Sequence, residues 1–342
     1  MSSFRYHTID PGSTVLVTGA NGFVGAHIAD QLLQKGYKVR GTVRDFSKHR
    51  WLVDLMSRKY GSDNFDLVTV KDMKIPGAFD EAVSGVSGII HVASPRSVHI
   101  TPQELIETTV AGTLSCLEAA VKERSVKRFV LTSSSSAVRS LQAYRRSDTV
   151  SANEYDEETL GLAEKIPADL PVMQKFMIAY FASKVAAEKA FWKWVTTHQP
   201  HFTVNTVLPC TIYGSPLEVS HQGFPSTSRI PLQILDGDTD SIKHVQRFYY
   251  VHVQDVARLH FAALVDPFTS NERIFAFAGP YCMNELFDIF SKVVPGYKAP
   301  AKIAGLDFPL AEIGPQRKAK ELLQDLGRKD FVELEETMID MR

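Results

Sequence analysis

Tyr180 and Lys184 have the residue types and the spacing of a proton-transfer pair. They lie four positions apart within 173–198, a stretch whose apolar pattern predicts a long helix, so both side chains should lie on one face. A phenol with a pKa of about 10 is a poor acid near neutrality, but a neighbouring ammonium lowers that pKa. The pair could therefore give a proton to a carbonyl oxygen during reduction. Among 11 tyrosines this spacing could also arise by chance, but only Tyr180 has it.

A run of serines could supply a third group to the same reaction. Ser133, Ser134, Ser135 and Ser136 directly follow the predicted strand 128–132, at its carboxyl end. A hydroxyl at that position could donate a hydrogen bond to the substrate oxygen as negative charge builds on it. The alternative is that the run ends the strand and bonds locally. Spacing alone does not choose the member that acts.

Three glycines stand between a short apolar strand and a helix start. The stretch 18–25 contains Gly19, Gly22 and Gly25, after Val15–Val17 and before an apolar helical pattern. Glycine allows a tight turn and the close approach of a phosphate, and the first N–H groups of the helix then face a pyrophosphate. The pattern predicts a dinucleotide site, with a plain strand-to-helix turn as the alternative.

Basic residues at the end of the second predicted strand favour NADP(H) over NAD. An NAD site places an acidic residue there for the ribose 2′-OH, whereas an NADP site places an arginine. Arg44 ends the strand, with Arg40 and Lys48 nearby and Asp45 as a confounding acid. These cations could instead be simply solvated. Asp72, after the third predicted strand, could accept from the adenine amino group or cap a turn.

Short apolar strands alternate with helical segments through residue 208. This alternation predicts an α/β fold with a Rossmann-type doubly wound parallel sheet, covered on both faces by helices. Ligands of such sheets bind at the carboxyl ends of the strands. Strands are expected over 15–17, 37–43, 65–70, 88–93, 128–132 and 202–208, and helices over 26–33, 46–60, 79–83, 105–122 and 173–198.

The pattern fades beyond Pro209, which predicts a smaller C-terminal substrate-binding lobe. That part holds a turn-rich stretch, a strand near 249–253, a helix over 256–265 and a strand over 273–277. We expect a dinucleotide-binding domain over 1–212, with about 248–270 returning to it. The substrate-binding lobe is expected over 213–247 and 271–342.

The walls of the substrate pocket are expected from residues 213–247 together with the long insertion 137–171. Long loops in compact domains are often functional, and both segments follow carboxyl ends of strands. Aromatic linings could come from Phe176, Phe224 and Tyr249, although core packing would explain each of them equally well. Pro95 and Ser135 are further pocket candidates.

Bulk composition excludes several other function classes. With 38 Lys+Arg against 39 Asp+Glu, no basic excess favours nucleic acid. The three cysteines have no metal-binding spacing and indicate a reducing compartment. Neither a signal peptide nor an apolar run of membrane-spanning length is visible. We expect a cytoplasmic protein without a metal or a membrane partner, whose partner is a small carbonyl substrate; its oligomeric state is open.

Together these residues resemble the extended short-chain dehydrogenase/reductase family. The chain is most similar to the dihydroflavonol-reductase-like group and, within it, to fungal NADPH-dependent carbonyl reductases. The resemblance covers most of residues 12–266. The matching stretches are 15–25, 37–44, 71–73, 91–95, 112–114, 126–134, 180–184 and 205–209.

The resemblance implies specific roles. Ser134 would be the catalytic serine, Tyr180 the general acid, and Lys184 the residue that also binds the nicotinamide ribose. Arg44 would contact the 2′-phosphate, and Pro209 would start the segment beside the nicotinamide. The residues implied to bind NADPH/NADP+ are Thr18, Gly19, Asn21, Gly22, Phe23, Val24, Arg44, Lys48, Asp72, Met73, Ala93, Ser94, Thr132, Tyr180, Lys184 and Pro209.

The chain departs from the family pattern in two places. Ser115 stands where close relatives have asparagine after the Gly-Thr-Leu triplet, which bears on the proton relay. The substrate-lining loops around 97–101 and 216–228 are unrelated to those of the family, so the substrate stays open.

Three hypotheses remain. The leading one is an NADPH-dependent reductase that transfers hydride to a ketone or aldehyde. The second is a sugar-nucleotide epimerase or dehydratase that retains NAD, against which Arg44 speaks. The third is a catalytically silent NADP-binding regulator, against which the intact Ser134, Tyr180 and Lys184 speak.

Overall fold

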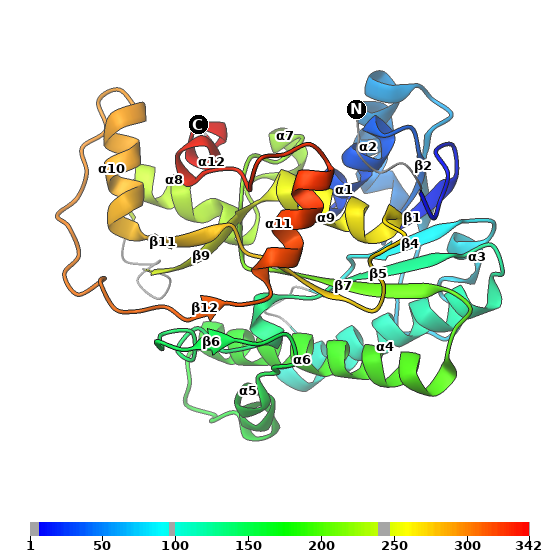
Figure 1. Cartoon of the computed structure of the whole chain (residues 1–342), viewed down its shortest axis with the longest axis horizontal. Helices are drawn as coiled ribbons and strands as arrows, with labels where there is room; N and C mark the ends of the chain where they lie inside the picture. The colour runs from blue at the N-terminus through cyan, green and yellow to red at the C-terminus, as the bar shows by residue number, and fades with distance from the viewer. Residues whose placement is uncertain (1–6, 96–99, 239–246, 342) are drawn as a thin grey trace.

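A seven-stranded parallel sheet forms the centre of the computed structural model, which describes residues 7–95, 100–238 and 247–341 (Figure 1). The strand order is β3-β2-β1-β4-β5-β7-β10, so the predicted doubly wound α/β fold is confirmed. The carboxyl ends of these strands meet along one edge, where ligands of such sheets bind. The strands are β1 Thr14–Thr18, β2 Lys38–Val43, β3 Phe65–Thr69, β4 Gly88–His91, β5 Arg128–Thr132, β7 Thr203–Pro209 and β10 Arg273–Ala276.

Helices cover both faces of this sheet, and the strands are therefore apolar on both sides. Ile89 and Phe129 belong to a core shared with helices α4 and α6, whereas the next residues, Ile90 and Val130, belong to a core shared with α1 and α9 (Figure 1). This alternation follows from the period of two along a strand. The helices are α1 Phe23–Gln34, α2 Phe46–Tyr60, α3 Asp80–Val83, α4 Pro102–Lys122, α6 Val172–His198, α9 Val253–Val265 and α11 Gln316–Asp325.

A smaller sheet of three strands, in the order β11-β9-β8, lies in the C-terminal part (Figure 1). Two further strands, β6 and β12, join the insertion after the serine run to the C-terminal segment. The strands are β6 Thr149–Val150, β8 Thr211–Tyr213, β9 Arg247–His252, β11 Gly279–Cys282 and β12 Glu312–Ile313. The remaining helices are α5 Glu157–Leu162, α7 Val219–Gln222, α8 Ile230–Leu235, α10 Met283–Val293 and α12 Leu334–Asp340, with 3-10 turns η1 Ser135–Ala137, η2 Ala163–Lys165 and η3 Ser226–Arg229.

Consecutive strands near residue 250 belong to different sheets. Strand β9 pairs with β8 and β11 of the small sheet, whereas β10 pairs with β7 of the large one. After β9 the chain continues through α9 into β10 of the large sheet. The expected domain boundaries stay a prediction. The apolar pattern of 249–253 predicts a buried strand but carries no information about which sheet that strand joins. Across the described segments, no helix is both long and apolar enough to cross a bilayer.

Candidate functional site

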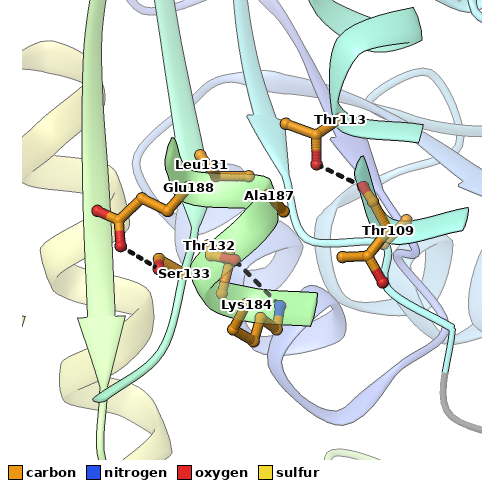
Figure 2. Close-up of a pocket in the computed structure, with 9 residues that line it drawn as sticks. Thr109, Thr113, Leu131, Thr132, Ser133, Lys184, Ala187 and Glu188 are labelled. Atoms are coloured by element: carbon orange, nitrogen blue, oxygen red, sulfur yellow. Dashed lines mark hydrogen bonds between the residues drawn. The ribbon is translucent and has the colours of Figure 1, made fainter. Parts of the chain in front are cut away.

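Helix α6 brings Tyr180 and Lys184 to the carboxyl end of β5. Lys184 is 7% exposed, and its Nζ donates to the backbone carbonyl of Thr132 at 3.4 Å. The same Nζ lies 6.0 Å from the centre of the Tyr180 ring. Figure 2 shows Lys184 reaching from the helix to Thr132. The spacing of four therefore places an ammonium beside both the phenol and the strand end.

The serine run alternates in direction, and this distinguishes its members. Ser133 Oγ donates to Glu188 Oε2 at 2.7 Å, on the helix side of the strand end (Figure 2). Ser134 Oγ accepts from the Ser136 backbone N at 3.2 Å and from Ser136 Oγ at 2.9 Å. A hydroxyl has two acceptor lone pairs and one proton. With both lone pairs filled, the Ser134 hydroxyl is left to donate its proton outward, which suits a group that binds a developing oxyanion.

The glycine loop has the geometry that a bound pyrophosphate requires. Gly19 has a φ of 65°, and a Cβ added there would lie 3.1 Å from Ala93 Cα. A Cβ at Gly25 would lie 2.3 Å from the Gly19 carbonyl oxygen, so the helix packs directly on the turn. Gly22 is the N-cap of α1 and provides no side-chain cap. The first-turn N–H groups of α1, which Phe23 begins, are therefore suited to an anion.

Thr18 joins the ends of β1 and β4. Its Oγ1 accepts from the backbone N–H groups of Val92 (2.9 Å) and Ala93 (3.0 Å) and lies 3.0 Å from His91 Nδ1. Since its lone pairs are used, the Thr18 hydroxyl donates to Nδ1, and the neutral His91 ring carries its proton on Nε2. Burial lowers the His91 pKa to about 3, which keeps the ring neutral. Thr18 thus orders the turn that carries Ala93 and the following Ser94.

Asp45, the acidic residue next to Arg44, caps a helix. Asp45 is the N-cap of α2 and accepts from Ser47 N at 3.0 Å and Ser47 Oγ at 2.6 Å, which lowers the pKa of its carboxyl group. Lys48 Nζ lies 3.7 Å from the other carboxylate oxygen. Arg40 donates to the backbone carbonyls of Ala82 in α3 and of Ser84 just after it. Arg44 is exposed just beyond β2, where the sequence predicts the 2′-phosphate contact.

Asp72 and Ser115 have local partners. Asp72 Oδ1 accepts from Lys74 N at 2.9 Å and caps a turn, one of the two roles expected for it. The side chain of the neighbouring Met73 fills the space above Gly112, where an added Cβ would lie 2.7 Å from it. Ser115 Oγ donates to the Ile75 carbonyl at 3.2 Å. The residue that departs from the family asparagine is therefore bonded to the loop after β3.

The aromatic pocket candidates have different surroundings. Phe176 stacks on Tyr180, with ring centres 6.1 Å apart and planes 17° apart. Tyr249 is buried at 5% exposure, and its hydroxyl donates to the Ala311 carbonyl, so it packs in the core. Phe224 is partly buried against the same core. Phe176 is therefore the candidate that lies beside Tyr180, the predicted general acid.

Other predicted residues have mixed surroundings. Pro209 is buried at the end of β7, and Pro95 is half-buried next to residues 96–99. Ser135 is buried, and its carbonyl accepts from the Tyr144 hydroxyl at 3.0 Å. Residues 96–99 and 239–246, parts of the expected pocket walls, lie outside the described residues.

Three partners of the site carried no sequence signal. His260 Nδ1 lies 2.7 Å from the Val256 carbonyl and must donate to it, so Nε2 accepts from Thr132 Oγ1 at 2.8 Å. Thr132 thus faces the site with its carbonyl, while its hydroxyl is bonded to α9. Gln222 of α7 donates to the carbonyls of Asn21 (3.2 Å) and Gly22 (3.3 Å), which joins the small lobe to the glycine loop. The third is Glu188, which bonds to Ser133.

A cavity of about 10 Å³ lies against Lys184 and is lined in part by Thr109, Thr113 and Glu188 (Figure 2). This space is sufficient for about one water molecule. This cavity is therefore too small to admit an organic substrate.

The buried histidines make stability depend on pH. Burial lowers the His260 pKa from 6.5 to about 4. Below pH 6.5 His260 binds a proton in the unfolded chain but not in the folded chain. The free energy of unfolding should therefore fall as the pH falls from 6.5 towards 4. The slope should be up to about 1.4 kcal/mol per pH unit for each such histidine. Urea unfolding of His260→Gln between pH 7 and 5 should show a shallower slope than the unmutated protein.

Exposed His201 offers the matched control, since His201→Gln should leave that slope unchanged. Equal slopes in His260→Gln and the unmutated protein would show that His260 is not held neutral by burial.

Comparison with known proteins agrees with this geometry. The NAD dependent epimerase/dehydratase family matches residues 15–276. The chain is 37% identical to "Ketoreductase adrE" of Penicillium rubens, over 98% of this chain and 97% of the relative. It is 35% identical to "Aldehyde reductase 2" of Sporidiobolus salmonicolor, over 100% and 98% of the two chains.

Solved structures of reductases have the same fold. Gre2 from Candida albicans in complex with NADPH superposes with a TM-score of 0.80 at 26% identity, covering 96% of this chain and 97% of Gre2. The resemblance inferred from the motifs is thereby confirmed. This chain belongs to the NAD dependent epimerase/dehydratase family, whose members similar to it include fungal ketoreductases.

Proposed function

We propose that this protein is an NADPH-dependent reductase that converts a small ketone or aldehyde to the alcohol. The observation that supports the proposal is the position of Lys184, whose Nζ lies 6.0 Å from the centre of the Tyr180 ring and donates to the Thr132 carbonyl, two residues before Ser134. Relatives named ketoreductase and aldehyde reductase support an oxidoreductase. A structural neighbour solved with NADPH supports the cofactor.

The residues around the glycine loop fit a nicotinamide dinucleotide. The uncapped start of α1 and the close packing of Gly19 on Ala93 suit a pyrophosphate, and exposed Arg44 suits a 2′-phosphate. Lys184 and Pro209 would hold the nicotinamide end. When bound, the reduced nicotinamide supplies a hydride to the carbonyl carbon.

The chain's own groups act on the carbonyl oxygen. The Ser134 hydroxyl, whose lone pairs are filled by Ser136, donates a hydrogen bond to that oxygen as its negative charge grows. Tyr180 gives it the proton. The Lys184 ammonium, held by the Thr132 carbonyl, favours loss of that proton by the phenol through its positive charge.

Each alternative has an observation against it. An epimerase that retains NAD would benefit from a free acid beside the ribose 2′-OH, but Asp45 is bonded to Ser47 as a helix cap. The similarity to UDP-glucose-4-epimerase from Stenotrophomonas maltophila, at 19% identity and a TM-score of 0.67, reflects the fold alone. A silent regulator would have no need for Ser134, Tyr180 and Lys184, all of which this chain has.

Tyr180→Phe should lower kcat by about 10²- to 10⁴-fold, because it removes the proton donor and retains the ring. NADPH oxidation with any accepted carbonyl measures the loss, and NADPH titration should show nearly unchanged affinity. Phe181→Leu, on the next residue of the helix, is the control and should retain turnover. A Tyr180→Phe protein with near-normal kcat would rule out the assigned proton donor.

Arg44→Asp should reverse or abolish the preference for NADPH over NADH, because the charge-assisted hydrogen bonds to a 2′-phosphate would be replaced by repulsion. The measurement is kcat/KM with each cofactor. Arg50→Asp, at an exposed position of α2, is the control. If the unmutated protein used both cofactors equally well, the role of Arg44 would be refuted.

A further inference from the structure

Glu188 is a carboxylate with no exposed surface, and both of its oxygens are saturated with hydrogen bonds. Oε1 accepts from Arg273 Nε at 2.8 Å, from Thr206 Oγ1 at 3.0 Å and from Trp192 Nε1 at 3.4 Å. Oε2 accepts from Ser133 Oγ at 2.7 Å and from Arg273 Nη2 at 3.1 Å. A buried carboxylate with this many charge-assisted bonds has a narrowly defined position.

Arg273 extends the same network to the insertion that follows the serine run. Its Nη1 donates to the carbonyls of Ala152 and, at 2.9 Å, Glu154. Its guanidinium carbon lies 4.2 Å from the centre of the Tyr155 ring. The pair Glu188–Arg273 therefore joins α6, β10 and the insertion at one point.

The position of Glu188 connects this network to the site. It lies four residues after Lys184 and eight after Tyr180, so all three share one face of α6. Its partner Ser133 directly precedes Ser134. Figure 2 shows the two bonds from this helix to the end of β5, Lys184 to Thr132 and Glu188 to Ser133, on consecutive residues of the strand end.

We propose that Glu188, through its hydrogen bond to Ser133, sets the register between α6 and the serine run and so positions Ser134 relative to Tyr180. Glu188 and Ser133 are positioning residues and do not touch the substrate. The inference rests on the proposed reductase function for its effect on rate. Its structural part, the ordering of the serine run by Glu188, does not depend on that function.

The chain offers a matched pair of variants. Ser133→Ala and Thr206→Val each remove one buried hydroxyl from the same carboxylate and leave the Glu188–Arg273 pair intact. Only Ser133 belongs to the serine run, since Thr206 lies in β7. A purely structural role predicts that both variants lower Tm and that neither changes the chemical step more than the other.

The experiment measures kcat, KM for NADPH, and hydrogen–deuterium exchange of residues 133–138 in both variants of the full chain. Ser133→Ala should lower kcat by about 10- to 100-fold, because a small displacement of a catalytic group is costly. KM for NADPH should stay within about twofold, since the effect is on the chemical step. Exchange of 133–138 should accelerate. Thr206→Val should leave kcat and that exchange unchanged.

In a protein that reduces carbonyls, a loss of kcat confined to Ser133→Ala supports the inference, and any other pattern of kcat overturns it. If the unmutated protein reduces no carbonyl, the proposed function fails. The positioning role of Glu188 is then tested by hydrogen–deuterium exchange alone. Faster exchange of 133–138 confined to Ser133→Ala would then support the positioning role, and equal exchange in the two variants would overturn it.

Discussion

The site depends on an ammonium group that the fold removes from water. A charge in a protein interior is costly unless polar groups surround it. Lys184 is 7% exposed, and the Thr132 carbonyl at the end of β5 accepts from it. This hydrogen bond joins α6 to the end of β5. Tyr180 lies one turn before Lys184 on the same helix and is therefore held at the strand end as well. The position of Tyr180 at the strand end is thus coupled to the solvation of one buried cation, to which the Thr132 carbonyl contributes.

Hydrogen bonds that serve structure also determine which groups remain for function. The hydroxyl of Thr132 donates to His260, that of Ser133 donates to Glu188, and that of Thr18 donates to His91. Asp45 is used as a helix cap. Ser134, with its lone pairs filled by Ser136, and exposed Arg44 are the positions suited to a ligand. Buried polar groups are nearly always hydrogen-bonded. At the carboxyl edge of the large sheet, the hydrogen-bond partners of each polar side chain therefore reduce the number of candidates for ligand binding.

The parts of the structure that depend on local pattern could be predicted from the sequence, and those that depend on distant pairing could not. The spacing of Tyr180 and Lys184 and the turn at Gly19 are local, as is the alternation of strands and helices. Spacing alone left all four serines open, and the resemblance pointed to Ser134; the bond from Ser133 to Glu188, 55 positions away, left no pattern in the sequence. Tyr249 was a candidate for the pocket lining, with core packing as the alternative, and the structure places it in the core with its hydroxyl bonded to the distant Ala311 carbonyl. Gln222 reaches Asn21 across 201 positions and leaves no pattern in either segment.

The most direct measurement follows the transferred hydrogen. A panel of ketones and aldehydes would be incubated with the protein and NADPH deuterated at both C4 positions of the nicotinamide, and the products analysed by mass spectrometry and NMR. We predict an alcohol with a single deuterium on the carbinol carbon and one NADP+ formed for each alcohol. If a folded protein that binds NADPH yields no labelled alcohol from any member of the panel, the result contradicts the reductase mechanism built on Ser134, Tyr180 and Lys184.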